Sequence, residues 1–178
     1  FDVHVANGKI VVEARSTSLG VKTWEMKVLA EKDPSALPWG AMGIDVVVES
    51  TGFFVSYEQS KMHLDAGAKK VVISAPAKGG DVKDSSVKGE TILLGVNEDK
   101  FGTCDITSNA SCTTNAASPL IAILDEGLGI EKALLNTVHA LTNSQPTVDS
   151  VNKHNIREGR AGGHNIIPTS SGSAIAVT

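Results

Sequence analysis

The chain has 178 residues, of which 41% are hydrophobic and 20% charged, with 16 Lys+Arg against 20 Asp+Glu. This much apolar material at a net charge of only -4 fits one soluble domain, or two small ones, and argues against intrinsic disorder. No run approaches the roughly 18 apolar residues that a membrane-spanning helix needs, and no basic cluster predicts a nucleic-acid surface.

The first predicted element is a β-hairpin over residues 3–13. Two apolar runs flank Asn7-Gly8, a pair that tolerates the positive φ angles of a type I′ turn. A further strand is expected at residues 26–30, where the side chains alternate in character. After it, Pro34 is expected to begin a turn, or a single helical turn, that reaches Trp39.

A parallel α/β arrangement is predicted for the next segment. Residues 45–50 (DVVVES) contain a short β-branched run, the pattern of a strand buried on both faces of a parallel sheet. Ser56 can cap a helix over residues 57–66 that stops at Gly67, and residues 71–73 (VVI) predict the next buried strand. The order strand, helix, strand favours a parallel sheet.

Loops and shorter elements make up the rest of the prediction. A surface loop is expected at residues 78–88, followed by strands at 92–94 and 105–107. Beyond them the pattern changes to a helical stretch at 116–124, a strand-like run at 133–141 and a polar, loop-rich segment at 142–167.

Residues 108–115 (SNASCTTN) have the clearest chemical character, because a polar loop there leaves a predicted strand and enters a helix. Cys112 stands at this junction, and the unpaired N–H groups and partial positive charge of a helix N-terminus favour thiolate over thiol. The backbone N–H of Cys112 and the side chain of Asn115 are available to stabilise an oxyanion. The alternative is a small buried cysteine without chemical function, which is our interpretation of Cys104.

A cysteine nucleophile needs a base, and His139 is the best candidate among the five histidines. It ends an apolar run just before a polar loop, so a strand could hold it rigidly at the edge of a site. His4 and His63 are interpreted as surface or packing residues. For His139 a purely structural role is the alternative.

A phosphate site is indicated further along the chain. Arg157 lies in a predicted loop that leads to residues 168–172 (PTSSG), and arginine together with hydroxyl and backbone donors commonly holds phosphate. The alternative for this arginine is a solvated charge on a surface loop.

Taken together, these motifs and their order resemble the phosphorylating glyceraldehyde-3-phosphate dehydrogenase family. The resemblance covers essentially the whole chain. The segments that carry it are 48–53 (VESTGF), 72–76 (VISAP), 108–115 (SNASCTTN), 137–140 (TVHA), 157–160 (REGR) and 165–168 (NIIP).

In that family a cysteine attacks the aldehyde to form a thiohemiacetal, a histidine acts as base, hydride passes to NAD, and inorganic phosphate cleaves the thioester to give 1,3-bisphosphoglycerate. The resemblance implies that Cys112 is the nucleophile and His139 the base. It implies an attacking-phosphate site lined by Ser111, Thr113, Ser171 and Gly172, and a substrate-phosphate site at Thr142. Arg157 matches the family's phosphate-binding arginine. It implies contacts with NAD from Thr51, Gly52, Phe53 and Ser74.

The resemblance also implies two incomplete domains. Residues 1–111 are expected to form a Rossmann-type parallel sheet that lacks its N-terminal βαβ unit, and residues 112–178 the start of an α+β catalytic domain. Phe1 opens within an apolar alternation and Thr178 ends an apolar run, so we expect a fragment that lacks both termini. No Gly-x-Gly-x-x-Gly with a following acidic residue occurs in it, which leaves the choice between NAD and NADP open.

The parent enzyme is expected to be a homotetramer that uses glyceraldehyde 3-phosphate and inorganic phosphate, without a metal, nucleic-acid or membrane partner. Two cysteines are too few for a disulfide framework, which fits a reducing, cytoplasmic setting. The alternatives are an enzyme similar to erythrose-4-phosphate dehydrogenase and a hydrolase with a cysteine–histidine dyad. The isolated chain is expected to be inactive, because a parallel sheet without its first strands leaves edges unpaired.

Overall fold

The N-terminal part of the chain forms a three-stranded antiparallel sheet. The structure is a computed structural model that describes residues 2–16, 20–78, 87–153 and 155–173. Strands β1 (Asp2–Ala6), β2 (Lys9–Ser16) and β3 (Gly20–Lys27) are ordered β1-β2-β3. Asn7 and Gly8 have φ angles of 51° and 72°, so the predicted hairpin turn is confirmed.

The strand predicted at residues 26–30 was placed too late in the chain. Strand β3 pairs with β2 from Ser16↔Gly20 to Lys9↔Lys27. Because β2 begins at Lys9, no partner is left for the residues after Lys27. A 3-10 helix, η1 (Pro34–Ala36), and the short helix α1 (Trp39–Met42) follow, which confirms the predicted turn.

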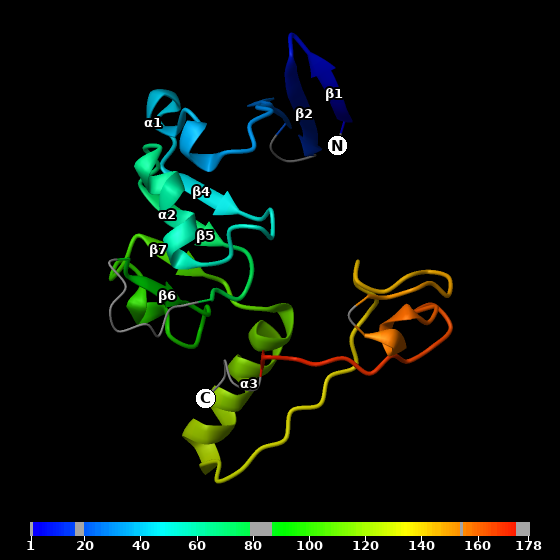
Figure 1. The fold of residues 1–178 in the computed structure, drawn as a ribbon. Helices are drawn as coiled ribbons and strands as arrows, with labels where there is room; N and C mark the ends of the chain where they lie inside the picture. Colours follow the sequence, from blue (N-terminus) through cyan, green and yellow to red (C-terminus); the bar gives the residue numbers. More distant parts are fainter. Residues whose placement is uncertain (1, 17–19, 79–86, 154, 174–178) are drawn as a thin grey trace.

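A four-stranded parallel sheet forms the centre of the molecule (Figure 1). Its strands are β4 (Val46–Glu49), β5 (Lys70–Ile73), β6 (Gly89–Thr91) and β7 (Ile106–Ser108), in the order β4-β5-β7-β6. All three pairings are parallel, so the predicted α/β class with an incomplete Rossmann-type sheet is confirmed.

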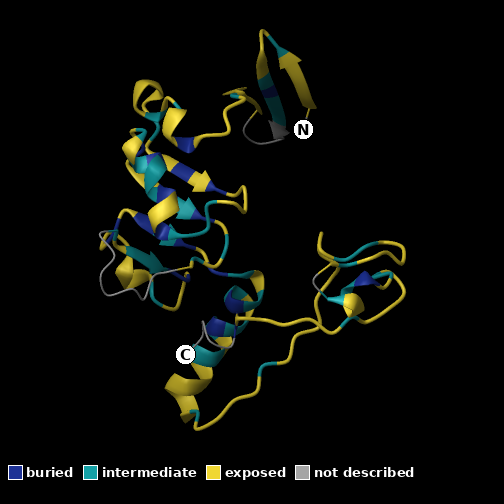
Figure 2. Cartoon of the chain, in the orientation of Figure 1, coloured by how far each residue is buried: buried dark blue, intermediate teal, exposed yellow. Residues whose placement is uncertain are grey.

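Two details of the predicted strands were wrong. β6 ends just before the run at residues 92–94, and Ile92 and Leu93 are buried beyond its end. β4 is buried on one face instead of two, since Val46 and Val48 are 53% and 61% exposed. The physical reason is that Val46 and Val48 lie on the face opposite the core, since their neighbours Val47 and Glu49 pair with the core residues Val71 and Ile73. Figure 2 shows exposed positions along β4.

Helix α2 (Tyr57–Asp65) packs on this sheet against β5 and β7. The Ser56 side chain accepts the backbone N–H of Gln59 as the N-cap, and Gly67 follows the helix with a φ of 103°, so this predicted helix is confirmed. Under it lies a small core of Tyr57, Val71, Ile73 and Ile106. Of the loop predicted at residues 78–88, positions 79–86 lie outside the described residues.

A long helix, α3 (Cys112–Leu128), begins four residues after β7. It includes the predicted helical stretch and ends at Gly129, which has a φ of 73°. Its first half is largely covered and its second half is exposed (Figure 2).

The strand predicted at residues 133–141 was wrong. That segment is extended but pairs with no other strand among the described residues, and Leu134 and Val138 are 95% and 89% exposed. An apolar run becomes a strand only where a neighbour can satisfy its backbone groups. The described residues of 142–167 are irregular, as predicted, apart from the 3-10 helix η3 (Ile156–Gly159). Another 3-10 helix, η2 (Glu98–Lys100), lies between β6 and β7 in the chain.

No helix within the described ranges is both long enough and apolar enough to cross a lipid bilayer.

Candidate active site

The predicted site residues gather mainly where the parallel strands end. β4, β5 and β7 are neighbours, and their carboxyl ends lie at one edge of the sheet. Hydrogen bonds extend this edge by one residue, since Ser74 N–H donates to the Glu49 carbonyl and Asn109 N–H to the Ile73 carbonyl, both at 2.9 Å. Open parallel sheets bind their ligands at this edge.

A sharp turn delivers Cys112 to the first turn of α3. Ala110 is buried and has a φ of 53°, a left-handed conformation that is uncommon for a residue with a Cβ. Ser111 then caps the helix by accepting the backbone N–H of Thr114 at 3.0 Å. Cys112 is therefore exposed at a helix N-terminus.

The structure pairs Cys112 with His139. The Sγ of Cys112 lies 3.1 Å from the Nε2 of His139, although an extended segment, and not the predicted strand, carries the histidine. The Nδ1 of His139 lies 2.7 Å from the carbonyl oxygen of Ala140. A carbonyl can only accept, so Nδ1 carries a proton and Nε2 faces the sulfur.

This contact shifts both groups toward an ion pair. The hydrogen bond with His139 lowers the pKa of the Cys112 thiol, with help from the N–H and hydroxyl of Thr113 and against a smaller opposing effect of burial. The bond to the Ala140 carbonyl, followed by the contact with Cys112, raises the pKa of His139. The contact with the imidazole thus explains the direction at Cys112, whereas at His139 the Ala140 carbonyl is the larger cause and the contact with Cys112 adds to it.

Asn115 does not have the role that the sequence predicted. Its amide nitrogen donates to the carbonyls of Asn109 and Ser111, at 2.7 and 2.8 Å. Both amide hydrogens are thus used in these two bonds, so Asn115 stabilises the loop of residues 109–112, called the cysteine loop below. Its side chain is not available to an oxyanion.

Hydroxyl groups from a distant segment join the N-terminus of α3. The Oγ of Ser173 lies 2.9 Å from the Oγ of Ser111, and Ser171 Oγ donates to Ser173 Oγ at 3.1 Å. The structure therefore brings Ser171 and Gly172 toward the cysteine loop with Ser111 and Thr113. Ser173 is buried and was missed by the sequence reasoning; the signal was the hydroxyl-rich run 169–173 (TSSGS).

Among the described residues, neither Thr142 nor Arg157 forms a hydrogen bond with Cys112. Thr142 bonds locally, to the side chains of Ser144 and Gln145, and Arg157 is exposed in η3. Figure 1 shows the loops around η3 well apart from α3.

Three of the residues expected to contact a cofactor follow β4. Thr51 donates its N–H to the Glu49 carboxylate at 2.7 Å, and its hydroxyl bonds to the same oxygen. Gly52 has a φ of 79° with open space at its Cβ position, and Phe53 is 79% exposed. The fourth residue, Ser74, is exposed after β5. Glu49 was not singled out from the sequence.

Within the part of the chain that the structure describes, no three His, Cys, Asp or Glu side chains are grouped as metal ligands.

Two family models match the chain. The model of the glyceraldehyde 3-phosphate dehydrogenase NAD binding domain matches residues 1–57. The model of the glyceraldehyde 3-phosphate dehydrogenase C-terminal domain matches residues 111–178.

Curated relatives show the same similarity. A glyceraldehyde-3-phosphate dehydrogenase of Mycobacterium tuberculosis (strain ATCC 25618 / H37Rv) is 51% identical over 155 residues, which cover 86% of this chain and 43% of the relative. That of Clostridium acetobutylicum is 48% identical over 174 residues, or 97% of this chain and 49% of the relative. That of Streptomyces coelicolor is 43% identical over 178 residues, or 99% and 50%. The chain thus spans about half the length of the curated relatives it matches.

Proposed function

The chain belongs to the glyceraldehyde-3-phosphate dehydrogenase family, and from this premise we propose that its parent protein is an NAD-dependent oxidoreductase of glycolysis. The reaction is the phosphorylating oxidation of glyceraldehyde 3-phosphate to 1,3-bisphosphoglycerate. The observation that carries the proposal is the 3.1 Å contact between the Cys112 sulfur and Nε2 of His139, which supplies an activated thiolate at a helix N-terminus.

Cys112 and His139 divide the covalent chemistry between them. When the Cys112 thiolate adds to the aldehyde carbon, the aldehyde oxygen takes a proton from Nε2 of His139 and a thiohemiacetal forms. The neutral Nε2 then takes this hydroxyl proton back as the carbon is oxidised to the thioester. NAD, when bound, supplies the acceptor for the hydride. An oxygen of inorganic phosphate then attacks the thioester carbon, and the carbon–sulfur bond breaks to release the Cys112 thiolate.

The residues after β4 and β5 fit a dinucleotide. Gly52 leaves open space at its Cβ position, so a ligand can approach its backbone closely. Phe53 offers an exposed ring for stacking, and Ser74 offers an exposed hydroxyl at the same edge. We assign Thr51, Gly52, Phe53 and Ser74 to this cofactor.

The hydroxyl groups at the N-terminus of α3 suit an attacking phosphate, because helix N-termini and hydroxyls bind anions. We assign Ser111, Thr113, Ser171 and Gly172 to this phosphate. On the family resemblance alone, Thr142 is assigned to the phosphate of the substrate and Arg157 to phosphate binding.

We further propose a domain division at Cys112, with a dinucleotide-binding domain over residues 1–111 and the start of a catalytic domain over residues 112–178. The family models that match residues 1–57 and 111–178 support it. The parent is proposed to be a cytoplasmic homotetramer, in keeping with two free cysteines. The isolated chain is proposed to be inactive, because the edge strand β4 leaves Val46 and Val48 exposed.

One assay tests the proposed function. The purified parent is given glyceraldehyde 3-phosphate, NAD and inorganic phosphate, and NADH formation is followed by absorbance. We expect activity that requires phosphate, that Cys112→Ser abolishes, and that the control Cys104→Ser retains. A preference for erythrose 4-phosphate would favour the related dehydrogenase, and phosphate-independent ester cleavage would favour a cysteine hydrolase.

A further inference from the structure

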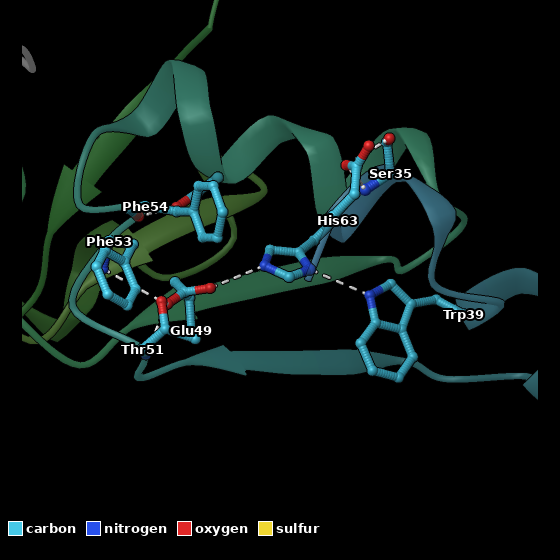
Figure 3. Close-up of polar contacts among 9 residues, drawn as sticks. Ser35, Trp39, Glu49, Thr51, Phe53, Phe54 and His63 are labelled. Carbon is cyan, nitrogen blue, oxygen red and sulfur yellow. Dashed lines mark hydrogen bonds and ion pairs between the residues drawn. The ribbon is translucent and has the colours of Figure 1, made fainter. Parts of the chain in front are cut away.

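A buried carboxylate stands at the carboxyl end of β4. The side chains of Glu49 and His63 are only 2% and 5% exposed, and Glu49 Oε2 lies 3.0 Å from Nε2 of His63. The other oxygen, Oε1, accepts the backbone N–H of Thr51 at 2.7 Å. Figure 3 shows Glu49 between Thr51 and His63, with Trp39 on the far side of the imidazole.

Trp39 fixes which nitrogen of His63 carries the proton. The indole Nε1 lies 3.1 Å from Nδ1 of His63, and an indole nitrogen can only donate. Nδ1 must therefore accept, so the proton of a neutral imidazole sits on Nε2 and points at Glu49. In this chain of hydrogen bonds, called the relay below, Trp39 donates to His63 and His63 donates to Glu49. Glu49 must therefore be an acceptor.

The side chain of Glu49 thus faces the donors of Thr51 and His63, and no lysine or arginine within the described residues forms an ion pair with it. Burial by itself raises the pKa of Glu49, but the hydrogen bonds from Thr51 and His63 outweigh it and leave the pKa below its ordinary value. A buried carboxylate surrounded by donors keeps its charge at neutral pH.

The same carboxylate organises the loop after β4. The Thr51 hydroxyl bonds to Oε1 of Glu49 and accepts the backbone N–H of Phe53 at 3.2 Å. The loop of residues 51–53 is thereby folded onto Glu49, which leaves Gly52 left-handed and the Phe53 ring exposed. These are the residues assigned above to the dinucleotide.

We infer that Glu49 is a positioning residue for the dinucleotide: with its acceptor state enforced by His63 and Trp39, it holds the 51–53 loop in its binding conformation. The inference rests on the proposed function and deepens it. Glu49 acts through Thr51, because its own carboxylate is buried and bonds to the N–H and hydroxyl of that residue.

Replacing Glu49 with glutamine would put a donor in contact with one of the two donors that Glu49 now accepts. A glutamine has one acceptor oxygen and one donor nitrogen, whereas Thr51 and His63 both donate to residue 49. Whichever way the amide turns, two donors face one another. His63 cannot relieve the conflict by moving its proton to Nδ1, because the indole N–H of Trp39 points at that nitrogen.

The additional change Trp39→Phe removes this block. His63 can then carry its proton on Nδ1 and accept from glutamine at position 49 through Nε2. The double variant is expected to bind NAD more tightly than Glu49→Gln alone, a gain on adding a second substitution that a loss of packing at Trp39 would not give.

The test is the Kd for NAD of the full-length parent, measured by titration calorimetry. Because an unpaired buried donor is costly, we expect Glu49→Gln to raise the Kd about ten-fold, and Trp39→Phe combined with Glu49→Gln to restore most of the affinity. The rate of Cys112 alkylation in the cofactor-free protein should stay unchanged, since the cysteine loop follows another strand. The matched control Glu25→Gln, on exposed β3 where Glu25 bonds to Lys9, should bind NAD like the wild type.

Unchanged affinity in Glu49→Gln, or additive losses in the double variant, would overturn the inference alone. A wild-type parent that does not bind NAD would overturn the proposed function, and this inference with it. If Glu49→Gln does not fold, the double variant carries the test. A double variant that fails to fold, while Trp39→Phe alone folds, would also count against the relay.

Discussion

The sulfur of Cys112 lies 3.1 Å from Nε2 of His139, across 27 positions of sequence. The first residue opens a helix and the second lies on an extended segment without strand partners. Each shifts the pKa of the other toward the charged form, so a change at either residue is expected to alter the titration of the other.

The first prediction concerns the reactivity of Cys112. Its lowered pKa places a larger share of thiolate at neutral pH than an ordinary cysteine has, and His139→Asn removes the largest cause of that shift. We expect the pH profile of alkylation by iodoacetamide to move to higher pH, with a several-fold slower reaction at pH 7. The control His4→Asn, in the hairpin sheet, should leave the profile in place, and the same profile in both variants would contradict the pairing.

The second prediction concerns the titration of His139. The Ala140 carbonyl is the larger cause of its raised pKa, and Cys112 the next. In Cys112→Ser, the pKa of His139 should therefore fall only part of the way to its ordinary value. Proton NMR of the imidazole C–H signals against pH measures this, and a complete return to the ordinary value would show that the Ala140 contact has no effect.

The third prediction concerns Ser173, which links Ser171 to Ser111. Ser173→Ala removes that link and loosens the proposed phosphate site. One lost hydrogen bond predicts a KM for inorganic phosphate about five-fold higher, with kcat little changed. Steady-state kinetics with varied phosphate tests it. The exposed neighbour Ser170 supplies the control, and equal effects of Ser170→Ala and Ser173→Ala would contradict the assignment.

The fourth prediction concerns packing at the start of β6. A Cβ added to Gly89 would overlap the ring of buried Tyr57, so Gly89→Ala should destabilise the fold by about 1–3 kcal/mol. At Gly127, near the end of α3, the space for a Cβ is open, and alanine should stabilise the helix by about 0.5–1 kcal/mol. Thermal unfolding of both variants should give shifts of opposite sign.

The fifth prediction concerns acid stability. The folded-state pKa of Glu49 is lowered, so its contribution to stability is present above the ordinary glutamate value of about 4.3. It is lost as pH falls through the lower folded-state pKa. The gap in free energy of unfolding between wild type and Glu49→Gln should thus narrow below about pH 4. Urea titrations at several pH values measure this difference in the free energy of unfolding. A difference that does not change with pH would contradict a charged Glu49 in the folded state.

Local features of the site could be predicted from the sequence because their physical causes are local. The cap at Ser111 needs only the N–H of Thr114, three residues away, and the turn at Asn7-Gly8 needs only its own φ angles. The position of Cys112 at a helix N-terminus follows from the same short-range rules.

The errors arise where a distant partner decides the outcome. The run at residues 133–141 has the composition of a strand, but composition does not reveal whether a neighbouring strand exists. Likewise, the residues next to Glu49 in the sequence do not indicate its role, since one of its partners comes from α2 and the other from the loop after β4. His63 was interpreted as a packing residue for the same reason, because the indole that sets its tautomer lies 24 positions earlier.

The strand order has a consequence for synthesis. β7 is made after β5 and β6 but lies between them, so neither of those strands can complete its pairing until residues 106–108 have left the ribosome. The next residues to emerge carry the reactive cysteine. Cys112 is therefore made only after the strand that joins β5 to β6, and in a nascent chain that stops short of β7, strand β6 has no partner in the described sheet while β5 pairs with β4 alone.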